Sequence, residues 1–251
     1  MEKKSLRMLL LGVYGMEVVE SGGALSKNVL QGGKSFASIM LSRDETRPQI
    51  EKAGEILGVE MNFTHFKGGE VEVTPPAKKK LVRVIRETKP HIIITQDPEH
   101  SYHDLDPDRR LAMLLILESI ALAARDFALD EMPELERHPI PTIYYMSPEN
   151  PNCVVDVQDV WEKKEAAMDE LKSQMEFSGK HFETYYGDKS MEAVVPGWNG
   201  MDDYYRKGRE AHRNLDRALH LYNGALSHFS RHTLAEAYRR EGKFQFENLI
   251  I

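Results

Sequence analysis

The chain has 251 residues, of which 41% are hydrophobic and 29% are charged, enough for one globular domain with a substantial core. A formal net charge of −7, without a long basic run, argues against nucleic acid as a partner. The single cysteine, Cys153, excludes an internal disulfide and is typical of a reducing compartment, so we expect a cytoplasmic protein.

Short apolar runs alternate with helical patterns along the first part of the chain. The first apolar run, 8–13, is too short to cross a membrane, so no membrane partner is expected. The alternation predicts a Rossmann-like three-layer α/β fold with a mostly parallel sheet over residues 1–176. Thr74 is expected to cap a helix that ends before Pro90. In chain order, strands are predicted at 6–13, 35–41, 60–66, 91–95, 142–146 and 154–157, and further helices at 22–30, 47–57, 106–124 and 160–175.

The rest of the chain, 177–251, is more polar and is predicted to be a helical C-terminal extension. Its helices are expected at 202–222 and 233–239. We expect this extension to pack on the same domain, as a lid or as a contact in a homo-oligomer.

Two loops are the candidates for chemistry, because ligands of such sheets bind beyond the carboxyl ends of the strands. The loop over 12–23 lacks the glycine pattern of a dinucleotide site. The loop over 97–108 holds five carboxylates and two histidines within twelve residues, a set that suits a divalent metal or an acid and a base. Asp106-Pro107 is also a good start for a helix, so capping alone explains part of this cluster.

The order and spacing of several segments resemble the PIG-L/LmbE-like deacetylases, a family that removes the N-acetyl group from glucosamine-containing molecules. The resemblance implies the fold described above, a catalytic zinc and an amino-sugar substrate. It also implies that 235–239 is the family's closing helix. The matching segments are Glu17 with Gly22-Gly23, then 41–45, 47–59, 90–95, 107–118, 155–164, Ser173-Gln174 and 235–239.

The family's first motif, A-H-P-D-D-E, falls on residues 12–17. The zinc-binding histidine of the motif is replaced by Val13, and its zinc-binding aspartate by Met16. The aspartate that acts as general base is replaced by Gly15, whereas Glu17 matches. Valine has no donor atom and methionine has only a soft thioether, which is unsuited to zinc.

The second motif, H-P-D-H-R, falls on residues 106–110. Asp106 replaces the assisting histidine and Arg109 replaces the third zinc ligand, whereas Asp108 is retained. Arg109 brings a permanent positive charge to the place of a cation, and we expect it to pair with Glu17 or Asp108.

These replacements favour a protein that binds a small, sugar-like molecule in the family's cleft without zinc-dependent deacetylation. No metal or other cofactor is expected. The predicted ligand-binding residues are Glu17, Arg43, Asp44, Asp97 and Arg109.

Two alternatives remain open from the sequence. The first is a hydrolase whose catalytic residues are His103, Asp106 and Asp108, working with Glu17. In that case zinc or another divalent metal is held by a rebuilt set of Glu17, His100, His103 and Asp106. The second is a non-catalytic oligomeric scaffold.

Overall fold

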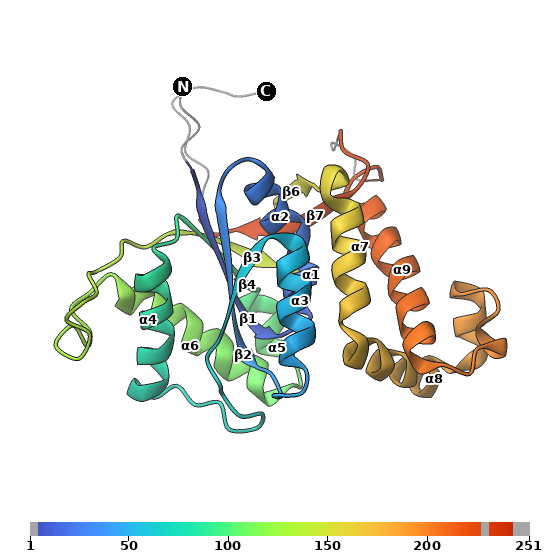
Figure 1. The fold of residues 1–251 in the computed structure, drawn as a ribbon, viewed down its shortest axis with the longest axis horizontal. Coiled ribbons are helices and arrows are strands. Elements are labelled where there is room, and N and C mark those ends of the chain that lie inside the picture. The colour runs from blue at the N-terminus through green and yellow to red at the C-terminus, as the bar shows by residue number, and fades with distance from the viewer. Residues whose placement is uncertain (1–4, 227–230, 243–251) are drawn as a thin grey trace.

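The computed structural model describes residues 5–226 and 231–242, which form a seven-stranded sheet with the strand order β3-β2-β1-β4-β5-β7-β6 (Figure 1). Strands β1 to β5 run parallel to one another, whereas β7 is antiparallel to both β5 and β6. The strands are β1 (Arg7–Tyr14), β2 (Lys34–Leu41), β3 (Val59–Phe63), β4 (Ile92–Gln96), β5 (Thr142–Met146), β6 (Cys153–Asp156) and β7 (Ala235–Arg240).

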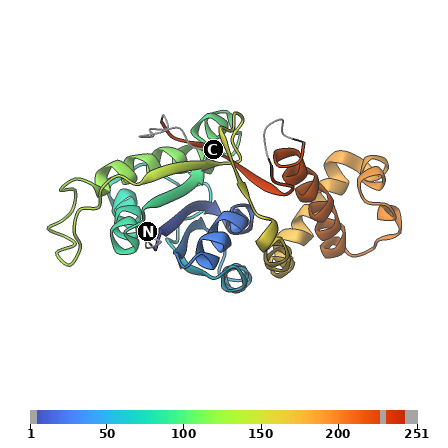
Figure 2. The same cartoon turned by 90° about the horizontal axis from the view of Figure 1, so that it is seen from above.

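Helices cover both faces of the sheet, which confirms the predicted three-layer α/β fold. One face carries α4 (Pro75–Thr88) and α6 (Pro107–Ala123), which pack against each other and on β1. The other face carries the short α1 (Glu17–Glu20), α2 (Gly22–Leu30), α3 (Arg47–Leu57) and α7 (Trp161–Glu170) (Figures 1 and 2). The remaining short helices are α5 (Pro98–His103), directly after β4, and η1 (Gln158–Val160) before α7.

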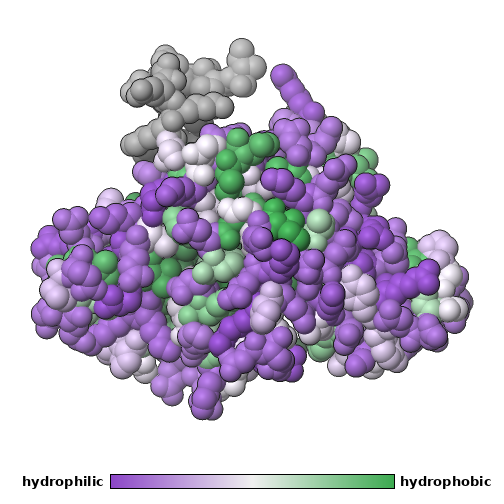
Figure 3. All heavy atoms as spheres, viewed as in Figure 1, coloured by the Kyte–Doolittle hydropathy of each residue, from purple (hydrophilic) through white to green (hydrophobic). Residues whose placement is uncertain are grey.

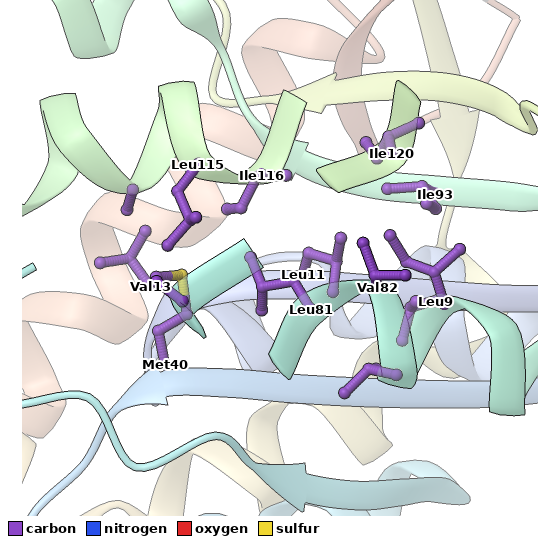
Figure 4. Close-up of a cluster of buried hydrophobic side chains, with 14 of the residues drawn as sticks. Leu9, Leu11, Val13, Met40, Leu81, Val82, Ile93, Leu115, Ile116 and Ile120 are labelled. Carbon is purple, nitrogen blue, oxygen red and sulfur yellow. The ribbon is translucent and has the colours of Figure 1, made fainter. Parts of the chain in front are cut away.

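The central strand β1 supplies side chains to two hydrophobic cores, one on each face of the sheet. Leu9, Leu11 and Val13 lie in the cluster that α4 and α6 close, as Figure 4 shows. Leu10 lies in the second cluster, with α2, α3 and α7. Successive side chains of a strand point to opposite faces, so this buried strand is apolar on both sides.

Two long helices that pack on each other lead into the C-terminal extension, and the second of them also packs on α7. They are α8 (Lys172–Val194), which is interrupted at Gly187 (φ 74°, ψ 159°), and α9 (Tyr204–Asn223). Between them a turn of 3-10 helix, η2 (Trp198–Gly200), buries Trp198 in a small apolar cluster. The face in Figure 3 is largely hydrophilic. Within the described residues, no helix combines the length and the apolar character that a membrane crossing requires.

Residues 233–239 are not the helix that the sequence predicts, because Ala235–Arg240 is strand β7. This segment pairs with β5 on one side and β6 on the other. It is also fixed by Glu236, whose carboxylate accepts hydrogen bonds from the N–H groups of Gly23 and Ala24, each at 2.8 Å. Partners more than 200 residues away therefore override the helix preference of the local sequence.

Two smaller differences concern helix ends. The predicted helix 160–175 is divided into α7 and α8 at Leu171, whose ψ of 55° is not helical. Thr74 does precede α4, but its side chain makes no capping hydrogen bond. Gly58 ends α3 with φ at 76°, a backbone conformation that glycine adopts most easily.

Candidate functional site

An open pocket of about 1050 Å³ lies at the carboxyl ends of β1, β2 and β3. Its walls come from the segments that follow those strands, from the first turn of α6 and from the start of α8. This is the edge of the sheet where ligands of doubly wound α/β folds bind. The polar and charged lining residues are Tyr14, Glu17, Glu20, Ser42, Arg43, Asp44, Thr46, Arg47, Gln49, His65, Lys67, Asp106, Arg109, Ser173 and Gln174.

Glu17 lies at the base of the pocket with only 1% of its side chain exposed. Its carboxylate accepts hydrogen bonds from the N–H groups of Val13, at 2.8 Å, and Tyr14, at 3.4 Å. Burial raises the pKa of Glu17 to about 7, although the positive charge of Arg109 acts in the opposite direction. The pocket therefore contains a buried carboxyl group that titrates near neutral pH.

Arg109 brings the positive charge to this carboxylate. Its Nη1 atom lies 3.0 Å from Oε1 of Glu17, which confirms one of the two pairings expected from the sequence. The guanidinium also lies over the Tyr14 ring, 5.0 Å from its centroid, and its Nε atom is 3.6 Å from Asp104. Burial lowers the pKa of Arg109, but Glu17, Glu20 and Asp104 outweigh that effect, so the group stays charged.

The carboxylates of Asp106 and Asp108, at the start of α6, mainly accept hydrogen bonds from backbone N–H groups. Asp106 accepts hydrogen bonds from the N–H groups of Asp108, at 2.9 Å, and Arg109, at 3.4 Å, so it caps α6 as the capping alternative predicts. Its other oxygen accepts the Tyr14 hydroxyl at 2.6 Å. Burial, followed by this bond to Asp106, raises the pKa of Tyr14. Asp108 accepts the N–H of Gly69 at 2.7 Å and thereby attaches the segment after β3 to α6.

The histidines predicted to be catalytic or metal-binding lie outside the pocket lining. His100 and His103 are both on α5 and both are exposed. His103 contacts Tyr102 edge to face, and Nε2 of His100 is 3.8 Å from Asp104. The structure brings Glu17, Asp106 and Arg109 together at the pocket, but it does not bring these two histidines there.

Of the other predicted ligand-binding residues, Arg43 and Asp44 line the pocket, whereas Asp97 does not. Asp97 is completely buried at the end of β4, where it accepts a hydrogen bond from Arg239 of β7 at 2.5 Å. Sequence reasoning had no signal for this pair, because its members are 142 residues apart.

Several lining residues were not predicted. They come from the end of β1, from α1, from the segment between β2 and α3, from the start of α3, from the segment after β3 and from the start of α8. One of them, His65, has φ at 53°, a left-handed conformation that is uncommon for residues other than glycine. The unpredicted polar lining residues are Tyr14, Glu20, Ser42, Thr46, Arg47, Gln49, His65, Lys67, Ser173 and Gln174.

The side chains present do not fit the zinc centre that the family resemblance implies. Val13 takes no part in the pocket, because its side chain lies in the hydrophobic core beside Leu115 and Met40 (Figure 4). Arg109 places a cation within 3.0 Å of Glu17, the one matching residue of the first motif. In residues 5–226 and 231–242, no group of three or more His, Cys, Asp or Glu side chains is arranged to hold a metal ion.

The chain is similar in sequence to the diacetylchitobiose deacetylase of Thermococcus kodakarensis, with 32% identity over 127 residues. The match covers 49% of this chain and 47% of that protein, so the chain matches about half the length of this curated relative. No family model matches the chain.

Solved structures share the fold over almost the whole chain. The N,N'-diacetylchitobiose deacetylase of Pyrococcus horikoshii superposes with a TM-score of 0.68 at 18% identity, covering 95% of this chain and 84% of that one. The 4-carboxy-2-hydroxymuconate hydratase of Pseudomonas putida superposes with a TM-score of 0.65 at 20% identity, covering 98% and 100%. With the motif order in the sequence, the sequence match over about half of the chain and the shared fold support the resemblance of the chain to the PIG-L/LmbE-like family.

Proposed function

We propose that the chain binds an amino sugar or a related small saccharide in this pocket and does so without zinc-dependent deacetylation. The observation that carries the proposal is the Arg109 guanidinium, which faces an open pocket and is paired with the buried Glu17 carboxylate. The same fold also occurs in a hydratase, so fold alone does not decide the chemistry.

The Arg109 guanidinium has N–H groups that are free to donate hydrogen bonds to a ligand. Its Nη1 atom donates to Glu17, whereas Nη2 has no hydrogen-bond partner within residues 5–226 and 231–242. The side chain is 26% exposed, so a molecule in the pocket reaches it. A guanidinium held in this way donates well to the carbonyl oxygen of an N-acetyl group or to a sugar hydroxyl.

The partners of Arg109 hold it in one orientation. The Tyr14 ring lies under its guanidinium, and the hydroxyl of Tyr14 is itself fixed by Asp106. Gln96 donates to the backbone carbonyl of Arg109 at 2.6 Å. Because this cation is already ordered, ligand binding costs little additional side-chain entropy.

The test is the affinity for N,N'-diacetylchitobiose, measured by calorimetry, in the wild type and in Arg109→Met. Loss of a charge-assisted donor is expected to weaken binding by about tenfold or more. Arg109→Lys keeps the charge but loses the planar fork, so its affinity should fall between the two. Arg110→Met is the matched control, because Arg110 is exposed and is not part of the pocket lining.

Two results would contradict the proposal. One is a wild-type protein that binds neither this disaccharide nor N-acetylglucosamine. The other is an Arg109→Met variant that binds as well as the wild type, with its fold verified by circular dichroism.

Hydrolysis without zinc is a second candidate, favoured by Glu17. A carboxyl group with a pKa of about 7 is suited to proton transfer at neutral pH. We expect acetate release from N,N'-diacetylchitobiose to stay at background, with or without added zinc. Release that persists in chelator, that Glu17→Gln abolishes and that His103→Ala leaves intact would instead establish this second candidate.

A further inference from the structure

Three rings form a row along one side of α8. Phe177 and His181 are stacked, with ring centroids 6.0 Å apart and planes inclined by 25°. His181 and Tyr185 follow at 4.4 Å and 33°. Because residues four apart lie on the same side of a helix, these side chains make one continuous surface, named here the aromatic row (Phe177, His181 and Tyr185).

The aromatic row starts at the pocket and leads away from it. Phe177 is a lining residue of the pocket, together with Ser173 and Gln174 from the first turn of the same helix. Tyr185 lies two turns further on, and eight residues of helix rise by about 12 Å. A ligand longer than the pocket therefore meets this row as it leaves.

The two end rings of the aromatic row are open to solvent. Phe177 is 62% exposed and Tyr185 is 74% exposed. The hydration of this apolar ring surface is unfavourable, so a ligand that covers it gains free energy. On one side the row is bordered by exposed polar residues of α8, namely Glu176, Lys180 and Thr184, and on the other side His181 contacts Phe182 edge to face at 6.1 Å. Because the row continues the pocket lining through Phe177, the occupant that it fits is a ligand that extends out of the pocket.

We propose that the aromatic row extends the pocket as a binding surface for the successive rings of an amino-sugar oligosaccharide. The inference rests on the proposed function, which places one end of the saccharide at Arg109. Aromatic rings contribute large, rigid contact areas with little loss of conformational entropy, and the apolar face of a pyranose ring matches them. Chain length should therefore raise affinity.

The experiment is calorimetry of the full chain with N-acetylglucosamine and its β-1,4-linked oligomers from the dimer to the hexamer. The wild type should bind the tetramer about tenfold more tightly than the dimer. Tyr185→Ala should lose this gain and leave the affinity for the dimer unchanged. Tyr186→Ala is the matched control, because Tyr186 is 59% exposed on the same helix but its ring lies beside Phe182, outside the row.

Each unfavourable outcome has one meaning. If the dimer binds through Arg109 but longer oligomers bind no better, the aromatic row is not a saccharide surface and the proposed function stands. If Tyr185→Ala and Tyr186→Ala weaken the tetramer equally, the row is also refuted. If Tyr185→Ala changes the oligomeric state in light scattering without changing saccharide affinity, the row is a contact between copies. If no member of the series binds, both proposals fail.

Discussion

Replacing Lys164 with methionine is expected to lower the free energy of unfolding by about 3–5 kcal/mol, because it leaves a buried carboxylate without its cation. The side chains of Lys164 and Glu236 are each 5% exposed, and Nζ lies 2.5 Å from Oε1. Nζ also donates to the backbone carbonyl of Glu20 at 2.6 Å. This single amine therefore joins α7 to β7 and to the end of α1, next to the base of the pocket.

The loss of stability in Lys164→Met should depend on pH. Burial raises the pKa of Glu236, but Lys164 and the other donors outweigh burial and hold this pKa below its usual value. A depressed carboxyl pKa contributes stability above the unfolded-state pKa, and this contribution is lost as the pH falls through the folded-state pKa. Without Lys164 the pKa of Glu236 rises, so the variant should lose less stability near pH 5 than near pH 8.

Urea denaturation at the two pH values measures this effect. Lys163→Met is the matched control, because Lys163 is the exposed neighbour on the same helix and its loss should change stability by only about 0.5 kcal/mol. Adding Glu236→Gln to Lys164→Met removes the unpaired charge and should restore part of the stability. An equal loss at both pH values would mean that packing, rather than charge, fixes β7 on the domain.

The same network shows why sequence predicted most of the sheet and missed its seventh strand. Apolar runs such as 8–13 and 91–95 predict buried strands, because parallel strands are covered on both faces and are therefore apolar on both sides. The segment 235–240 has no such run. Its place between β5 and β6 depends on partners of Glu236 and Arg239 that lie far away in the sequence.

The candidate site was also predicted only in part from the sequence. The loop after β1 and the start of α6 were predicted from their position in the fold, and they do supply Glu17 and Arg109. The hydrolase alternative placed the histidines of the second loop in this site as well. Asp97 accepts the N–H of Glu99 and starts the short helix α5, which carries His100 and His103 to exposed positions outside the pocket lining. The positions of His100 and His103 therefore depend on the helix cap at Asp97, a residue that was predicted from the sequence only as a candidate ligand-binding residue.

The far wall of the pocket comes from α8, whose position depends on a close crossing with α9 at two glycines. A Cβ atom at Gly208 would lie 1.9 Å from the carbonyl oxygen of Met175, and one at Gly179 would lie 2.2 Å from that of Tyr204. These neighbours are backbone atoms, so the helices have to move apart to admit even a methyl group. Only glycine fits at positions 179 and 208 without moving the helices apart, although glycine has a low helix propensity.

Gly208→Ala is therefore expected to lower the free energy of unfolding by about 1–3 kcal/mol, although alanine is favoured over glycine in a helix by about 1 kcal/mol. Gly200→Ala is the matched control, because a Cβ atom there meets nothing within 4 Å and its effect should be small. Chemical denaturation measures both. Because α8 carries Ser173, Gln174 and Phe177 to the pocket, Gly208→Ala should also weaken saccharide binding at temperatures where the variant is still folded. A variant as stable as the wild type would mean that α8 and α9 shift freely against each other, and the wall that they form could not then hold a ligand in one position.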